Sequence, residues 1–293
     1  MTDNNKERDP ISGIETTGHE WDGIKELNNP APRWWLWVFI ITIIWSIGYW
    51  VVYPAWPTIA GATKGKWNWT QYTQLKEKQA EILARQEGYL QKLQTTKLED
   101  ISKDPALYEF ARLGGAVTFK ENCAACHNSG GQGRRGYPNL NDDDWLFGGK
   151  LGDIYKTIKV GIRSNHPDTQ GVQMPAFGKD GVLKQEQIAA VAEYVEKLHL
   201  GDKAERAPAY EEGRKIFTEQ CSSCHGNNGE GSRETGAPRL NDNIWLFGGK
   251  RENIVESISV AHAGVMPTWE NRLDDNAIKS LAVYVHSLGG GEQ

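Results

Sequence analysis

The chain has 293 residues and a formal net charge of −5, from 33 lysines and arginines against 38 aspartates and glutamates. This length predicts about two domains, and the slight acidic excess argues against a nucleic-acid-binding protein, which usually carries a basic face. All four cysteines fall in two short motifs near residues 123 and 221, so none remains for a structural disulfide.

A long uncharged stretch follows a polar start. No charged residue lies between Arg33 and Lys64. Within it, the 23 residues from Trp34 to Trp56 are apolar on all sides, and as a helix they would span roughly 34 Å, enough for a bilayer core of about 30 Å. Aromatic residues at both ends are typical of membrane interfaces. A cleavable signal peptide would have a shorter apolar run and a small-residue cleavage site. We predict an N-terminal segment over 1–33 and a transmembrane helix over 34–57.

The next segment, 58–105, is a predicted linker that contains an amphipathic helix. Residues 64–97 lack proline, and Leu75, Ile82 and Tyr89 recur at heptad spacing, which favours a helix with one apolar stripe. Two roles stay open for this stripe. It packs on the chain's own domains, or it docks on a partner subunit or the membrane surface.

A sequence repeat occupies the rest of the chain. Leu140–Asn141–Asp142 and the run Trp145 to Lys150 recur as Leu240–Asn241–Asp242 and the run Trp245 to Lys250. We predict one domain over 106–199, a linker over 200–206 and a second domain over 207–293, with a disordered glycine-rich end. Helices are expected over 107–122, 153–160, 185–198, 210–220, 253–260 and 275–287. Each repeat is so small that its side-chain core is thin, and a large bound apolar group would complete it.

Both repeats carry a Cys-x-x-Cys-His motif, at Cys123, Cys126 and His127 and at Cys221, Cys224 and His225. This pattern is typical of covalent c-type haem attachment, in which the two thiols bond the porphyrin and the histidine becomes the proximal iron ligand. A zinc half-site and a redox dithiol are the alternatives. Each motif has its own histidine and lies far from the other, which favours two haems over one zinc site.

The chain has two internal methionines, Met174 and Met266, which lie 47 and 41 residues after the motif histidines and each precede a proline. Methionine as the sixth ligand gives His/Met iron with a raised potential, whereas core packing is the ordinary role of a methionine. We predict the axial ligands to be His127, Met174, His225 and Met266. Iron closed on both faces has no site for substrate, so we expect no catalytic residue and single-electron transfer.

Other polar side chains lie near the two methionines. His166 and His262 are rival sixth ligands, although a histidine on such a loop more often bonds a haem carboxylate or a backbone carbonyl. Arg163 is a candidate partner of a haem carboxylate. His199 and His286 lie near helix ends, where we expect them to face solvent.

The run Gly161 to Gln170, together with Gln173 to Gly178, resembles the first haem domain of the di-haem subunit (subunit III, or subunit P) of cbb3-type cytochrome c oxidases. The segments 17–24, 241–246 and 284–291 are similar to the same family. The resemblance covers almost the whole chain and departs from the family pattern at Ala261–His262–Ala263. It implies an all-α fold, with one N-terminal transmembrane helix followed by two tandem cytochrome c domains.

The resemblance also implies a function. In that family the subunit takes electrons from a donor cytochrome c and passes them toward the mono-haem cytochrome c subunit and the catalytic haem-copper subunit, which reduces dioxygen and pumps protons. It implies two covalently bound haem c groups here and an electron-entry subunit that is not itself catalytic.

Because c-type haem is attached outside the bacterial cytoplasm, we expect the N-terminus in the cytoplasm, the helix in the inner membrane in contact with lipid, and both haem domains in the periplasm. The alternative is a free-standing membrane-anchored di-haem cytochrome c that serves another dehydrogenase or reductase. A di-haem peroxidase would need an open coordination site, and a methionine for each haem argues against it.

Overall fold

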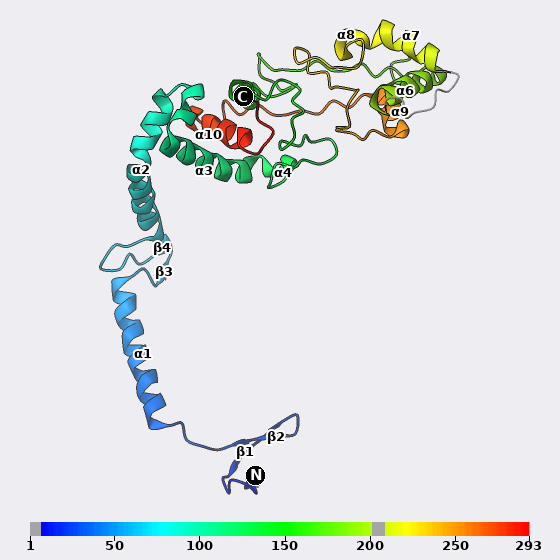
Figure 1. Cartoon of the computed structure of the whole chain (residues 1–293). Coiled ribbons are helices and arrows are strands. Elements are labelled where there is room, and N and C mark those ends of the chain that lie inside the picture. Colours follow the sequence, from blue (N-terminus) through cyan, green and yellow to red (C-terminus); the bar gives the residue numbers. More distant parts are fainter. Residues whose placement is uncertain (1–6, 201–208, 293) are drawn as a thin grey trace. The chain divides into compact units, whose positions relative to one another are not determined.

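The structure is a computed structural model that describes residues 7–200 and 209–292 (Figure 1). The chain divides into two compact units, Met1–Arg85 and Gln86–Gln293. Long helices dominate the described residues, and the strands are few and short, which confirms the predicted all-α class. The predicted linker at 200–206 falls, except for Leu200, outside the described residues.

The first unit begins with a hairpin that the sequence analysis missed. Strands β1 (Thr16–Trp21) and β2 (Ile24–Leu27) pair antiparallel, with Trp21 opposite Ile24. The two residues between them, Asp22 and Gly23, have φ values of 50° and 86°. An Asp-Gly pair with two positive φ angles is a preferred two-residue hairpin turn, so the signal was present in the sequence.

Helix α1 (Arg33–Val52) is the one described helix that is long and apolar enough to cross a membrane, and none of its residues is buried. It ends before the predicted limit, because Pro54 disfavours helical geometry at the preceding residue. The chain then turns through the short strands β3 (Pro57–Thr58) and β4 (Gly61–Ala62). It comes back to the helix end, where the Lys66 amide donates to the Val51 carbonyl at 2.9 Å.

Helix α2 (Gln71–Thr95) crosses the boundary between the two units, and the 3₁₀ turn η1 (Leu98–Lys103) follows it. Near its end, Leu93 is fully buried and Tyr89 stacks on Phe110 with ring centroids 5.0 Å apart. Toward its start, Leu75 and Ile82 are exposed. The last turns of the stripe therefore pack within the second unit, to which they belong.

The second unit has eight helices in its described part. They are α3 (Pro105–Asn122), α4 (Ala124–His127), α5 (Leu151–Val160), α6 (Gln185–Leu200), α7 (Tyr210–Gln220), α8 (Ser222–His225), α9 (Arg251–Val260) and α10 (Asp275–His286). The six helices that were predicted lie within two residues of their expected limits. Helix α3 starts where Asp104 accepts hydrogen bonds from the Ala106 and Leu107 amides at 3.1 and 3.2 Å, as an N-cap does before a first-turn proline.

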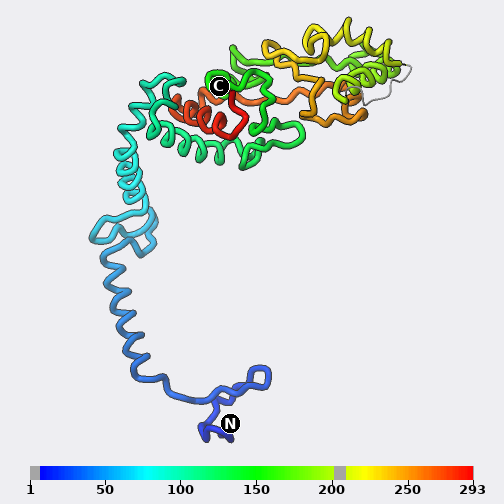
Figure 2. Tube along the Cα trace, in the orientation of Figure 1, coloured from blue at the N-terminus to red at the C-terminus, as the bar shows by residue number. Residues whose placement is uncertain are grey.

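The two repeats exchange their last helices. Helix α3 packs against α10, and α6 packs against α7, so the C-terminal helix of each repeat completes the core of the other (Figure 1). We call α3, α4, α5 and α10 the first core, and α6, α7, α8 and α9 the second core. In Figure 2 the trace shows the C-terminal helix lying beside the first repeat rather than beside its own.

Buried side chains confirm the exchange. In the first core, Phe119, Ile154 and Ile158 come from the first repeat and join Ile278 and Leu281 from the second. The second core mixes the repeats in the same way, with Ile188, Val191 and Val195 of α6 against Ile216, Phe217 and Ile254. The predicted domain limits, 106–199 and 207–293, describe the sequence repeats and stay a prediction, whereas each packed core draws on both repeats.

A glycine sits where each exchanged pair of helices crosses. A Cβ added at Gly115 of α3 would lie 2.0 Å from the Ser280 carbonyl oxygen of α10, and one at Gly213 of α7 would lie 1.9 Å from the Ala190 carbonyl oxygen of α6. Real Cβ atoms do not approach carbonyl oxygens so closely. The absence of a side chain at these two positions is what lets the backbones meet.

Two segments carry the chain between the cores, residues 161–174 and 261–266, and we call them the crossing segments. They pair where Ile162 and Met266 exchange two backbone hydrogen bonds of 3.0 Å each. Gly161 has a φ of +75°, and a Cβ there would lie 2.5 Å from the Met266 carbonyl oxygen. The two crossing segments thus lie in direct contact.

The end of the chain is ordered by packing on the first repeat, so the prediction of a disordered glycine tail was wrong. The Trp145 indole N–H donates to the Gly290 carbonyl at 2.6 Å, and the Glu292 amide donates to the Gly149 carbonyl at 2.9 Å. A Cβ at Gly290 would lie 1.7 Å from the Asp142 carbonyl oxygen. The glycine is there for close approach and not for flexibility.

Candidate functional site

Each Cys-x-x-Cys-His motif follows directly on the first helix of its repeat. Cys123 ends α3, and the single turn α4 ends at His127, whose amide donates to the Cys123 carbonyl at 2.9 Å. Positions i, i+3 and i+4 share one face of a helical turn. The two thiols and the histidine of one motif are therefore presented together, and α8 repeats this arrangement from Cys221 to His225.

The proximal histidines are held in one tautomer. The Nδ1 atom of His127 lies 3.1 Å from the Pro138 carbonyl oxygen, and Nδ1 of His225 lies 3.0 Å from that of Pro238. A carbonyl oxygen can only accept, so Nδ1 carries the proton and Nε2 keeps its lone pair for a metal. Burial lowers the pKa of both histidines, which keeps that lone pair free at neutral pH.

These two carbonyls are functional positions that the sequence analysis missed. The signal was available, because a proline follows the motif histidine by 11 residues in one repeat and by 13 in the other. A proline restricts its own backbone, so it presents its carbonyl from a fixed direction. Pro138 and Pro238 are therefore positioning residues for the two histidines.

The thiols do not fit the two alternative chemistries. All four cysteines are free, and burial raises the pKa of Cys123 and of Cys221 to about 11, whereas a redox dithiol needs a lowered thiol pKa. Within residues 7–200 and 209–292 no group of three or more His, Cys, Asp or Glu side chains is arranged to hold a metal ion, whereas structural zinc takes four such ligands. Haem c attachment instead requires two thiols that bond the porphyrin and one neutral imidazole that binds the iron, and these are the groups that each motif presents.

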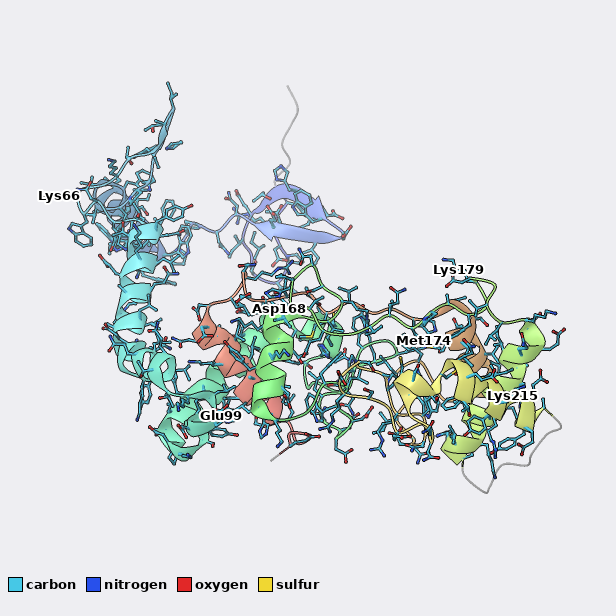
Figure 3. The ribbon with its side chains drawn as sticks, turned by 90° about the horizontal axis from the view of Figure 1, so that it is seen from above. Lys66, Glu99, Asp168, Met174, Lys179 and Lys215 are labelled. Carbon is cyan, nitrogen blue, oxygen red and sulfur yellow. The ribbon has the colours of Figure 1, made fainter. Side chains whose placement is uncertain are left out.

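The methionines lie in the core opposite to their own repeat. Met174 of the first repeat packs against the second core, together with Cys221, and Met266 of the second repeat packs against the first core, together with Cys123. Figure 3 shows Asp168 beside the first core and Met174 beside the second, so the chain changes cores between them. Each core thus combines the cysteines and histidine of one repeat with the methionine of the other.

The rival ligand His166 has both ring nitrogens occupied. Its Nδ1 accepts from the Asp168 amide at 3.0 Å, and its Nε2 lies 2.7 Å from Glu270 Oε2. Lys159 pairs with the other oxygen of that carboxylate at 3.0 Å. The hydrogen bonds from His166 and then Lys159 hold the pKa of Glu270 below its usual value. His166 therefore joins the two repeats, and no ring nitrogen is left for iron.

The expectation that His199 and His286 face solvent was wrong. His286 Nε2 donates to the Glu292 carbonyl at 2.8 Å, which helps to hold the chain end. His199 meets the Trp245 ring edge-on, with ring centroids 5.2 Å apart. Both are half-buried at the ends of the exchanged helices, where they close the two cores.

Two helical repeats, each with a Cys-x-x-Cys-His turn whose histidine bonds a proline carbonyl, and a methionine packed against each of the two cores, define a tandem c-type cytochrome with one candidate membrane helix. The family model described as cytochrome c oxidase, cbb3-type, subunit III matches residues 111–195 and 208–285. The model of the N-terminal domain of cytochrome oxidase-cbb3, FixP, matches residues 13–60. The chain belongs to the family of cbb3-type cytochrome c oxidase subunit III.

Similar proteins agree along the whole chain. It is 51% identical over 294 residues to the cbb3-type cytochrome c oxidase subunit CcoP of Azospirillum brasilense, which covers 98% of this chain and 99% of that protein. It is 51% identical over 292 residues to subunit FixP of Bradyrhizobium diazoefficiens, with 100% of both chains covered. Subunit CcoP of Cereibacter sphaeroides is 47% identical over 279 residues. The resemblance noted from the sequence is confirmed, and cytochrome c domains of this family imply bound haem c.

Proposed function

We propose that this chain is the electron-entry subunit of a cbb3-type oxidase, with one haem c held by Cys123 and Cys126 and a second held by Cys221 and Cys224. The duplicated hydrogen bond from a proximal histidine Nδ1 to a proline carbonyl carries this proposal. A haem c group supplies a one-electron iron couple, whose potential a His/Met ligand pair raises. The protein's part is to fix the ligands and to leave no site for substrate.

We pair the ligands across the repeats. The exchange of helices supports His127 with Met266 in the first core and His225 with Met174 in the second, since each methionine packs against the same buried cluster as the cysteine of that core. On this pairing each haem is enclosed by both repeats. The proposal keeps the four predicted ligands, and the packing supports their grouping.

We propose the partners and the location by analogy with the family. We place the N-terminus in the cytoplasm, α1 in the inner membrane against lipid, and both cores in the periplasm, where c-type haem is attached. Electrons arrive from a donor cytochrome c and leave toward the mono-haem cytochrome c subunit and the haem-copper subunit, which catalyses dioxygen reduction. The chain itself is not catalytic.

The proposal is tested by affinity purification of the tagged full-length chain in mild detergent from its own membranes. We expect the mono-haem cytochrome c and the haem-copper subunit to copurify, and pyridine haemochrome analysis of the isolated chain to give two haem c groups. Copurification with a dehydrogenase or reductase and no haem-copper subunit would favour the free-standing cytochrome. Fewer than two haems per chain would contradict the assignment of the sites.

The exposed start of α2 gives a prediction about assembly. Leu75 and Ile82 lie on one face and are 55% and 45% exposed, and we propose that this face packs on another oxidase subunit. Ile82→Glu is expected to reduce the amount of copurified haem-copper subunit at least about tenfold, because burying an isoleucine side chain is worth about 1.5–3 kcal/mol. The measurement is the ratio of the subunits after purification.

Ala84→Glu is the matched control for that variant. It adds the same carboxylate about 200° around the helix from Ile82, at a position that is also exposed. We expect this variant to copurify as the wild type does. Equal losses in both variants would show that added charge, and not the apolar face, weakens assembly.

A further inference from the structure

The crossing segments contain two basic side chains that the proposed function leaves unassigned. Arg163 lies in the segment that leads to Met174, and His262 lies in the segment that leads to Met266. Both segments pass between the cores, where Ile162 and Met266 pair. Each side chain is partly buried and is oriented by one contact within the protein.

Arg163 is a cation that is held in place by the protein backbone. Its Nε donates to the Gly264 carbonyl at 2.7 Å, which ties one crossing segment to the other. A Cβ at Gly171 would lie 3.1 Å from one of its terminal nitrogens and 3.3 Å from the Phe147 ring, so the guanidinium lies in a confined place. In the described part of the chain no carboxylate forms an ion pair with it, and burial alone lowers its pKa. A partly buried charge without a partner is costly.

His262 shows the same incomplete bonding. Its ring stacks on Phe247, with ring centroids 4.2 Å apart and an interplanar angle of 19°. Its Nε2 is buried and has no hydrogen-bond partner among the described residues. Buried polar atoms are nearly always hydrogen-bonded, so the fixed ring presents an unused nitrogen beside the segment that carries Met266.

We propose that Arg163 and His262, one in each crossing segment, are positioning residues that bind the carboxylates of the haem groups. By this contact they set the reduction potential of the haem iron. This inference rests on the proposed haem sites. Both side chains offer N–H donors, and charge-assisted hydrogen bonds to carboxylates are strong. A cation held near the iron favours the reduced form, which carries one positive charge less. The Arg163 charge therefore raises the potential that the His/Met ligands establish, and a hydrogen bond from His262 acts in the same direction because it draws negative charge away from a haem carboxylate.

The test of Arg163 compares three variants of the full-length protein by spectroelectrochemical titration. Arg163→Met is expected to lower the ratio of reduced to oxidised haem about tenfold at a fixed potential for at least one centre, which is about 59 mV for a one-electron couple. Arg163→Lys keeps the charge and is expected to restore most of the ratio. Arg135→Met removes an exposed arginine that pairs with Glu256 at 3.1 Å and is expected to leave both potentials unchanged.

Two variants separate the contributions of His262. His262→Phe keeps the stack on Phe247 and removes the ring nitrogens, whereas His262→Gln keeps an N–H donor and removes the stack. We expect the potential to fall in the Phe variant and to stay near the wild-type value in the Gln variant. The reverse order would show that the ring only packs, and that Nε2 takes no part in haem binding.

Redox-induced infrared difference spectra of the wild type, with isotope-labelled haem carboxylates, provide a test that needs no substitution. Carboxylate bands that report hydrogen-bonded anions support the proposal, and bands typical of fully hydrated carboxylates overturn it. Pyridine haemochrome analysis is done on every sample. Fewer than two haems in the wild type would contradict the proposed sites themselves. Two haems whose potentials do not change on substitution of Arg163 and His262 would contradict only this inference.

Discussion

Replacing Met174 with histidine is expected to lower the reduction potential of the haem attached to Cys221 and Cys224, and not that of the haem attached to Cys123 and Cys126. Methionine raises the potential relative to a second histidine, and axial ligands together span about 0.8 V. We therefore expect a step on the order of 0.1 V or more at one centre. Potentiometric titration with optical detection measures it.

The centre that changes is identified in chains that carry a single haem. Cys123→Ala with Cys126→Ala leaves only the haem at Cys221 and Cys224. In this background Met174→His is expected to move the potential and to abolish the long-wavelength band of Met-ligated ferric haem. Met266→His is the matched control and is expected to do neither. A response to Met266→His instead would support ligand pairing within each repeat and contradict the exchange.

Gly115→Ala is the second change with a large expected effect. The new Cβ would lie 2.0 Å from the Ser280 carbonyl oxygen and 2.7 Å from Tyr284 Cβ, so α3 and α10 must separate. Overpacking of this kind costs about 1–3 kcal/mol, and the contact with a rigid backbone places the cost at the upper end of that range. Denaturant titration of the haem-loaded protein, followed by far-UV circular dichroism, measures the loss in the free energy of unfolding.

The neighbouring glycine provides the control. At Gly114 an added Cβ would meet only the Ser280 side chain, at 3.8 Å or more, which is ordinary contact. Gly114→Ala is expected to stabilise the protein by about 0.5–1 kcal/mol, since alanine is the better helix former. If the two alanine variants were equally stable, the close approach of α3 and α10 would be refuted.

Local signals were sufficient for most of the helices. The span of α7 was predicted without error and those of α3, α5 and α10 nearly so, because each segment has periodic apolar residues. Helices α3 and α10 also begin at an aspartate N-cap. The same holds for the Cys-x-x-Cys-His turns, whose geometry depends on five consecutive residues. The hairpin at 16–27 also had a local signal, the Asp22–Gly23 turn, although the hairpin was not predicted.

The exchange was not predictable from local patterns, for a physical reason. Helices α6 and α10 both present an apolar face that includes a Tyr-Val pair, Tyr194–Val195 and Tyr284–Val285. The spacing of apolar residues identifies which face of a helix is buried, but it does not identify which other helix packs against that face. In the structure Tyr284 packs beside Phe119 and Tyr194 beside Phe217, and the duplicated sequence fits either choice. The partner is decided by contacts between residues far apart in the chain.

The exchange also has a consequence for how the protein is made. Helix α3 leaves the ribosome more than 150 residues before α10, the helix that covers it. The apolar face of α3 that packs on α10 therefore stays uncovered until the C-terminal helix has been synthesised. A shortened gene that kept a single repeat would encode half of each core and no complete core. After the exchange of helices, neither copy of the repeat can be lost without the loss of both cores.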